Sequence, residues 1–206
     1  MLFPIPLWHG TSAHLLPLIK EHGLGGRNVM ADWNVMEFLA STFPHLNVGE
    51  FDFADPDYPD LMPIRSAIGG GAAGMNFEYG HVYLAGGYDR AADYAQNAPE
   101  LVSFAKVILD AAQRRGIGAV QERLASYPEL EEFLMRDPAP VVLKLPPVPF
   151  SWIKDEKGGE KVLPRRDLDD SDMSIWSQVG FRLTEVIPFD GIEIIDAKDH
   201  ECTWHF

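Results

Sequence analysis

The sequence has almost no cysteine, few positive charges and no long hydrophobic run. Among its 206 residues there is one cysteine, Cys202, so the chain cannot form an internal disulfide and suits a reducing compartment. No apolar segment approaches the roughly 20 residues that crossing a bilayer requires. The start, Met1-Leu-Phe-Pro-Ile-Pro, lacks the basic region of a signal peptide. We therefore expect a cytoplasmic protein without a membrane partner, with a secreted effector or toxin as the alternative.

Basic residues are outnumbered, with 17 lysines and arginines against 31 aspartates and glutamates and a net charge of −14. Such a surface repels phosphate backbones, so general nucleic-acid binding is not expected. Hydrophobic residues make up 46% of the chain, which is enough to build a folded core.

Recognisable metal and phosphate motifs are also missing. The histidine pairs His9/His14 and His200/His205 lack the helical four-residue spacing, with an associated glutamate, of a zinc protease. The glycine-rich segment 69–74 lacks the Gly-Lys-Ser/Thr of a P-loop. We expect no metal cofactor.

The pattern of apolar residues predicts one α+β domain over residues 1–206, with a helical insertion at about 98–137. Residues 44–66 are rich in prolines and acidic side chains and read as turns, and residues 151–178 read as a long surface loop. Strands are expected at 5–11, 81–85, 140–146, 180–188 and 191–196, and helices at 13–22, 32–42, 90–96, 100–115, 119–125 and 128–135.

The centre of the chain, residues 79–97, has the pattern of a strand followed by a helix. Gly86-Gly87 ends the strand, Asp89 is the predicted N-cap, and helix-forming residues follow. Tyr83 and Tyr94 are eleven positions apart, in the strand and in the helix. They are either two core tyrosines or two aromatic faces that enclose a flat heterocycle.

Three blocks taken together resemble the His-Tyr-Glu class of ADP-ribosyltransferases, which includes diphtheria toxin and the poly(ADP-ribose) polymerases. The first is Leu7-Trp-His-Gly-Thr-Ser12, the second is Tyr83 with Ala91-Ala92-Asp93-Tyr94, and the third is Phe181-Arg-Leu-Thr-Glu-Val-Ile-Pro188. The three blocks are short, and they follow one another along the chain in the order that the family has. The resemblance implies a split β-sheet core and an enzyme that transfers ADP-ribose from NAD.

The resemblance also implies roles for individual residues. The backbone of Gly10, in the His-Gly-Thr11 motif, would pair with the nicotinamide carboxamide, and His9 would bond the adenosine ribose. Tyr83 and Tyr94 would stack on the nicotinamide. Glu185 would bond the 2′-hydroxyl of the nicotinamide ribose and stabilise an oxocarbenium-like state, as carboxylates do in glycosidases. His9, Tyr83 and Glu185 would thus be the catalytic set.

Some features stay open. Many polymerases of this class have a serine eight residues after the first tyrosine, and this chain has Ala91 there, as in toxin-like members. Glu193 is a second candidate for the glutamate. Arg27 is expected to hold the pyrophosphate, with Arg90 as the alternative. The acceptor is an unidentified protein or small molecule. NAD glycohydrolase, RNA 2′-phosphotransferase and a non-catalytic acidic binding protein are the competing functions.

Overall fold

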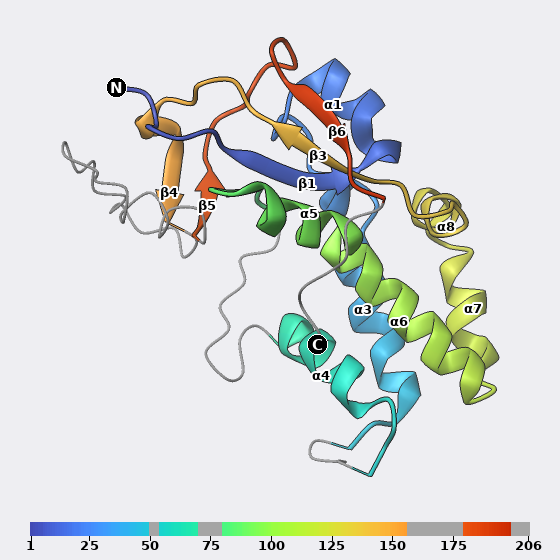
Figure 1. Cartoon of the computed structure of the whole chain (residues 1–206). Helices are drawn as coiled ribbons and strands as arrows, with labels where there is room; N and C mark the ends of the chain where they lie inside the picture. Colours follow the sequence, from blue (N-terminus) through green and yellow to red (C-terminus); the bar gives the residue numbers. More distant parts are fainter. Residues whose placement is uncertain (50–53, 70–79, 156–178, 199–206) are drawn as a thin grey trace. The chain divides into compact units, whose positions relative to one another are not determined.

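The computed structural model describes residues 1–49, 54–69, 80–155 and 179–198, and these form two compact units (Figure 1). Of the described residues, 1–28, 80–99, 138–155 and 179–198 make up the first, which we call the sheet unit. Residues 29–49, 54–69 and 100–137 make up the second, the helical unit. The predicted helical block at 98–137 lies mostly in the helical unit, which also contains a segment from the first half of the chain.

The sheet unit is built on six strands, each antiparallel to its neighbours in the order β4-β5-β2-β1-β3-β6. The strands are β1 (Trp8–Ser12), β2 (Tyr83–Ala85), β3 (Pro140–Lys144), β4 (Ile153–Asp155), β5 (Gly180–Leu183) and β6 (Glu193–Asp196). The short helices η1 (Ala13–Leu15), α1 (Leu16–His22) and η3 (Phe150–Trp152) complete it, together with α5 (Tyr88–Gln96). The coarse prediction of a mixed helix and antiparallel-sheet fold is confirmed.

The strands of this sheet are not joined equally well. β1 and β3 are paired at five consecutive positions, from Trp8 opposite Lys144 to Ser12 opposite Pro140. β1 and β2 are paired at one position only, Trp8 opposite Ala85. The join between β1 and β2, which we call the seam, is therefore the least backbone-bonded boundary between neighbouring strands of the sheet.

Helix α5 lies directly on the backbone of β1 (Figure 1). A Cβ atom added at Gly10 would lie 2.0 Å from the carbonyl oxygen of Ala91 and 2.6 Å from the amide nitrogen of Ala95. Only glycine permits this approach, because no larger residue fits against backbone atoms at that distance. At the start of the helix, Tyr88 packs edge-on against Trp8, with ring centroids 5.7 Å apart.

The helical unit is organised around one apolar core. Its elements are α2 (Val29–Asp32), α3 (Val35–Thr42), η2 (Phe43–Leu46), α4 (Tyr58–Ile68), α6 (Glu100–Arg114), α7 (Gly118–Leu124) and α8 (Pro128–Leu134). Fully buried side chains from α3, α4, α6, α7 and α8 meet in the core, among them Phe38, Ile64, Ile108, Val120 and Leu130.

One charge cluster fastens the segment before α4 to the end of α6. Asp57 is 8% exposed and accepts hydrogen bonds from Arg114 at 2.6 Å and from Arg115 at 3.0 Å. Arg115 also binds Asp55 at 2.6 Å and the carbonyl of Leu46 at 2.7 Å. Burial acts to raise the pKa of Asp57, but the hydrogen bonds and charges of the two arginines outweigh it and hold that pKa below its ordinary value of 3.8.

Three local predictions need correction. Residues 58–68 form helix α4 rather than turns, because Pro59 lies in the first helical turn, where no amide bond is lost, and Pro63 is accommodated in the interior. The helix expected at 32–42 is divided, since Asn34 has φ of 52°, and α3 begins after it. Gly87, not Asp89, is the N-cap of α5.

Ser12 takes the capping role predicted for it, since its hydroxyl accepts from the amide of His14 at 3.3 Å, although this first turn is the 3-10 helix η1. Within the described ranges, no helix combines the length and hydropathy that a membrane span needs.

Candidate functional site

The three motif-bearing strands are neighbours, and their functional ends lie at one edge of the sheet. β5, β2 and β1 are adjacent in that order. Because neighbouring strands are antiparallel, the C-terminal ends of β1 and β5 lie level with the N-terminal end of β2. Tyr83 is the first residue of β2, which begins two residues later than the strand expected at 81–85. Thr11, Tyr83 and the residues after Leu183 share this edge.

His9 connects the first motif to the second. Its Nδ1 lies 2.8 Å from the carbonyl oxygen of Tyr83. A carbonyl only accepts, so Nδ1 carries the proton. Burial lowers the pKa of His9 from 6.5, although the hydrogen bond to Tyr83 acts in the opposite direction. The imidazole is consequently neutral at pH 7, and its Nε2 presents a hydrogen-bond acceptor.

The backbone of Gly10 points into the seam. The amide of Leu145 donates to the carbonyl of Leu7 at 2.9 Å, so Leu7 and Leu145 form a hydrogen-bonded pair of the β1–β3 ladder. Bonded and non-bonded positions alternate along an antiparallel pair, which directs the N–H and C=O of Gly10 away from β3 and toward β2. The β1–β2 ladder has already ended at Trp8.

The predicted residues divide between the two faces of the sheet. His9 and Thr11 share one face by strand alternation, and Thr11 is 3% exposed. Gly10 and Tyr83 belong to the other face, on which α5 lies. Arg182 on β5 and Lys154 on β4 continue the row of Tyr83 on that face.

Tyr94 lies on the flank of α5 that faces β2 and β5. Gln96 donates to the carbonyl of Ala197, just after β6, at 2.7 Å, so the Gln96 flank faces the β3–β6 half. Residues two apart on a helix are about 200° apart around its axis. Tyr94 therefore projects over the opposite half, the one that contains Tyr83. It is 48% exposed and is not a core tyrosine.

Arg90, one turn before Tyr94, holds the tyrosine on this flank. Its Nη2 lies 3.0 Å from the Tyr94 hydroxyl, and its guanidinium carbon lies 5.5 Å from the ring centroid. From the sequence, Arg90 is expected only as the alternative ligand of the pyrophosphate. The i, i+4 spacing of arginine and tyrosine was the signal that could have identified this pair.

Glu185 follows β5 and is exposed, close to both the start of β2 and the loop after α1. The amide of Leu183 donates to the carbonyl of Val82 at 2.9 Å. Leu24 and Ile187 exchange two backbone hydrogen bonds, of 2.8 and 3.0 Å. A Cβ at Gly25 would lie 3.6 Å from the carbonyl oxygen of Glu185 and 3.8 Å from the Val82 side chain. Glu185 is thereby fixed, through its backbone, beside Gly25 and two residues after Leu183, which is bonded to the residue before Tyr83.

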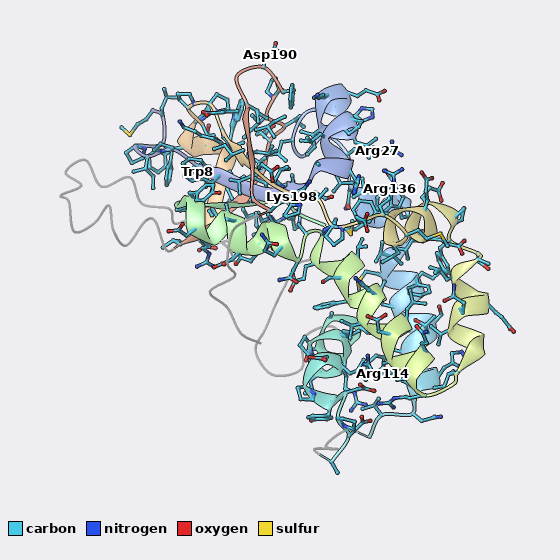
Figure 2. The ribbon with its side chains drawn as sticks, turned by 45° about the vertical axis from the view of Figure 1, so that its right-hand side comes forward. Trp8, Arg27, Arg114, Arg136, Asp190 and Lys198 are labelled. Atoms are coloured by element: carbon cyan, nitrogen blue, oxygen red, sulfur yellow. The ribbon has the colours of Figure 1, made fainter. Side chains whose placement is uncertain are left out.

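Arg27 lies on that same loop, after α1, and is exposed (Figure 2). Asn28 donates from its side chain to the carbonyl of Gly80 at 3.3 Å, which fastens the far end of the loop to the segment before β2. The loop that carries Arg27 therefore lies beside Glu185 and beside Gly80, in the segment that leads into β2.

Glu193, the second candidate glutamate, lies elsewhere. It is opposite Lys144, which is itself opposite Trp8, at the other end of β1 and beyond β3. Its carboxylate is 3.3 Å from the ammonium of Lys144. Of the two glutamates, Glu185 is the one at the edge shared by Thr11 and Tyr83.

Among the residues that the structure describes, no three His, Cys, Asp or Glu side chains form a group suited to a metal ion. Cys202, His200, His205 and residues 70–74 of the glycine-rich segment lie outside the described residues. So does most of the loop predicted at 151–178, whose first part contains β4.

Compared with protein-family models, with curated proteins and with solved structures, the chain matches none of them.

Proposed function

We propose that the chain is an NAD-dependent mono-ADP-ribosyltransferase, with its site at the edge where β1, β2 and β5 end or begin. The observation that carries the proposal is the adjacency of the three motifs. They are far apart in sequence, yet they occupy neighbouring strands, and His9 is hydrogen-bonded to the carbonyl of Tyr83. A histidine, a tyrosine and a glutamate scattered for unrelated reasons would have no cause to meet at one edge.

Substrate binding follows from the orientation of the groups. The N–H and C=O of Gly10, directed into the seam, suit a primary carboxamide, which has one acceptor and one donor to pair with them. Nε2 of the neutral His9 can accept a hydrogen bond from a ribose hydroxyl. Tyr94, on the flank of α5 over the β2 half, and Tyr83 supply aromatic surface for the nicotinamide ring. Arg27 is the candidate for the pyrophosphate.

The reaction breaks the bond between the nicotinamide nitrogen and C1′ of its ribose. The bonding electron pair leaves with the ring, so nicotinamide departs neutral and positive charge develops on the sugar. Glu185 faces this charge as a carboxylate, and an acceptor oxygen or nitrogen then attacks C1′ and releases its proton to solvent. Loss of one such charge contact in a transition state costs on the order of 10²–10³ in rate.

Water as the acceptor would make the same site an NAD glycohydrolase. The exposure of Glu185 is the observation that favours keeping this second candidate, since solvent reaches the position where the acceptor must arrive.

The test uses NAD labelled separately in nicotinamide and in adenylate, incubated with the protein and a cell lysate. Release of nicotinamide with adenylate label on macromolecules supports the transferase, and release with label only in ADP-ribose supports the glycohydrolase. Glu185→Gln is expected to keep NAD binding and to lower release by about 10²–10³. Glu193→Gln is the matched control and should release nicotinamide at the normal rate. No release by the unaltered protein would end the proposal.

A further inference from the structure

Within the described part of the chain, the side chain of Arg90 contacts Tyr94, a residue of the proposed nicotinamide site. Its guanidinium is bound to the hydroxyl of Tyr94 at 3.0 Å and lies 5.5 Å from the centre of that ring. Arg90 is half-buried, whereas Tyr94 is 48% exposed. The arginine is thus the better anchored member of the pair, and it restricts the orientation of the tyrosine.

A positive charge at Arg90 is unexpected next to a site that would bind NAD. The pyridinium ring of NAD carries a positive charge, and a ring stacked on Tyr94 would have the Arg90 guanidinium as a like-charged neighbour. Two positive charges that both lie next to the Tyr94 ring repel each other measurably in a partly buried site. An arginine that served only to bind NAD would be badly placed there.

Cleavage of the bond changes this balance. As the bond to C1′ breaks, the positive charge moves from the ring to the ribose, away from Arg90 and toward Glu185. A cation on the ring side and a carboxylate on the sugar side therefore both favour the direction in which the charge moves. Interactions that improve between ground state and transition state accelerate a reaction.

We propose, building on the proposed function, that Arg90 is a positioning residue with a second effect. It orients Tyr94. Its positive charge also weakens binding of the charged pyridinium ring of NAD relative to a neutral ring, so that the repulsion between Arg90 and the ring disappears when nicotinamide leaves as a neutral molecule. The site should accordingly bind NADH, whose ring is neutral, with little penalty from Arg90.

The test compares the dissociation constants of NAD and NADH by calorimetry in the Glu185→Gln background, which limits turnover. The two ligands differ in charge only at the ring, so their ratio isolates the effect of the Arg90 charge. Arg90→Gln is expected to strengthen NAD binding relative to NADH by about threefold to tenfold, the effect of a partly screened repulsion between two like charges in a partly exposed site. Arg90→Lys, which keeps the charge, should leave the ratio near that of the parent.

Arg123 gives a matched control. Its guanidinium lies 5.7 Å from the ring of Tyr127, again four residues on, in the helical unit. Arg123→Gln should leave the ratio unchanged. With active protein, Arg90→Gln should lower kcat and the KM for NAD together by similar factors, so that kcat/KM changes little.

The outcomes separate the two proposals. If the unaltered protein neither binds NAD nor releases nicotinamide, the proposed function fails. If it does both, and Arg90→Gln weakens NAD and NADH equally or leaves their ratio unchanged, only the role of the Arg90 charge is overturned. An equal shift of the ratio in Arg90→Lys would also overturn it.

Discussion

The two units achieve stability in different ways. The helical unit has a continuous apolar core of interlocking helices and a buried charge cluster at Asp57. The sheet unit has a smaller apolar cluster, rich in alanine, in which the backbone of α5 lies directly on Gly10, and its seam has only one ladder pair. All residues of the proposed site belong to the sheet unit. Backbone N–H and C=O groups that make no hydrogen bond to a neighbouring strand can bind a ligand. The sheet unit, in which the seam has few such interstrand bonds, is therefore better suited to hold a ligand than the helical unit.

The largest loss of stability is expected for a substitution at Gly10, where the sheet unit has no space for a side chain. In Gly10→Ala the new methyl group would meet the Ala91 carbonyl oxygen at 2.0 Å, and no side-chain rotation relieves a clash with backbone. We expect a loss of about 3 kcal/mol or more in the free energy of unfolding, measured by urea denaturation, and displacement of α5 with loss of nicotinamide release.

Gly118→Ala, at the start of α7 in the helical unit, is the control for this substitution. Nothing lies within 4 Å of the added methyl group, so the change should be neutral or stabilise by up to about 1 kcal/mol. If Gly10→Ala and Gly118→Ala had the same free energy of unfolding, the close approach of α5 to β1 would not matter for stability.

A smaller effect is expected from the charge cluster of the helical unit. Asp57→Asn replaces the carboxylate shared by Arg114 and Arg115 with a neutral amide while Arg115 keeps its bonds to Asp55, at a cost of about 1–3 kcal/mol in unfolding free energy. Because the pKa of Asp57 is held below 3.8, its contribution is present above that value and is lost as pH falls through the lower folded-state pKa. Circular dichroism melts between pH 2 and 6 should show this loss in the parent and not in Asp57→Asn. Nicotinamide release at pH 7 by the folded variant should be unaffected.

The smallest effect is expected at His9. Its pKa is lowered from 6.5 by burial, so the stability contribution of the neutral ring is complete above 6.5 and declines as pH falls below it toward the folded-state pKa. His9→Gln should remove this decline and weaken NAD binding about threefold to tenfold, the usual value of one hydrogen bond. Wild-type affinity and an unchanged pH profile in calorimetry would contradict the assigned role.

The sequence was informative where pattern and local chemistry agree. The Ser12 cap, the strand before Gly86 and the helices of 100–134 follow from turn residues and apolar periodicity. The sequence does not predict helix α4, because its prolines resemble turn signals and the helix is evident only from the packing of Leu61 and Ile64 in the core. The break at Asn34 has no comparable local signal.

The candidate site was predicted as residue types and spacings, and its geometry was not. Nothing local to His9 indicates that its ring binds the carbonyl of Tyr83, because that contact spans 74 positions. The two-way bond between Leu24 and Ile187 is equally non-local. Such contacts arise from strand order, which short motifs do not encode.

The seam also bears on how the protein would respond to its substrate. Few backbone bonds hold β2 to β1, so local opening there requires less energy than opening between β1 and β3. A carboxamide bound to Gly10 would add hydrogen bonds at this boundary and act as a temporary rung of the ladder. Amide hydrogen exchange at Tyr83–Ala85 would then slow on ligand binding, while the exchange of Val141–Leu143 would already be slow without it.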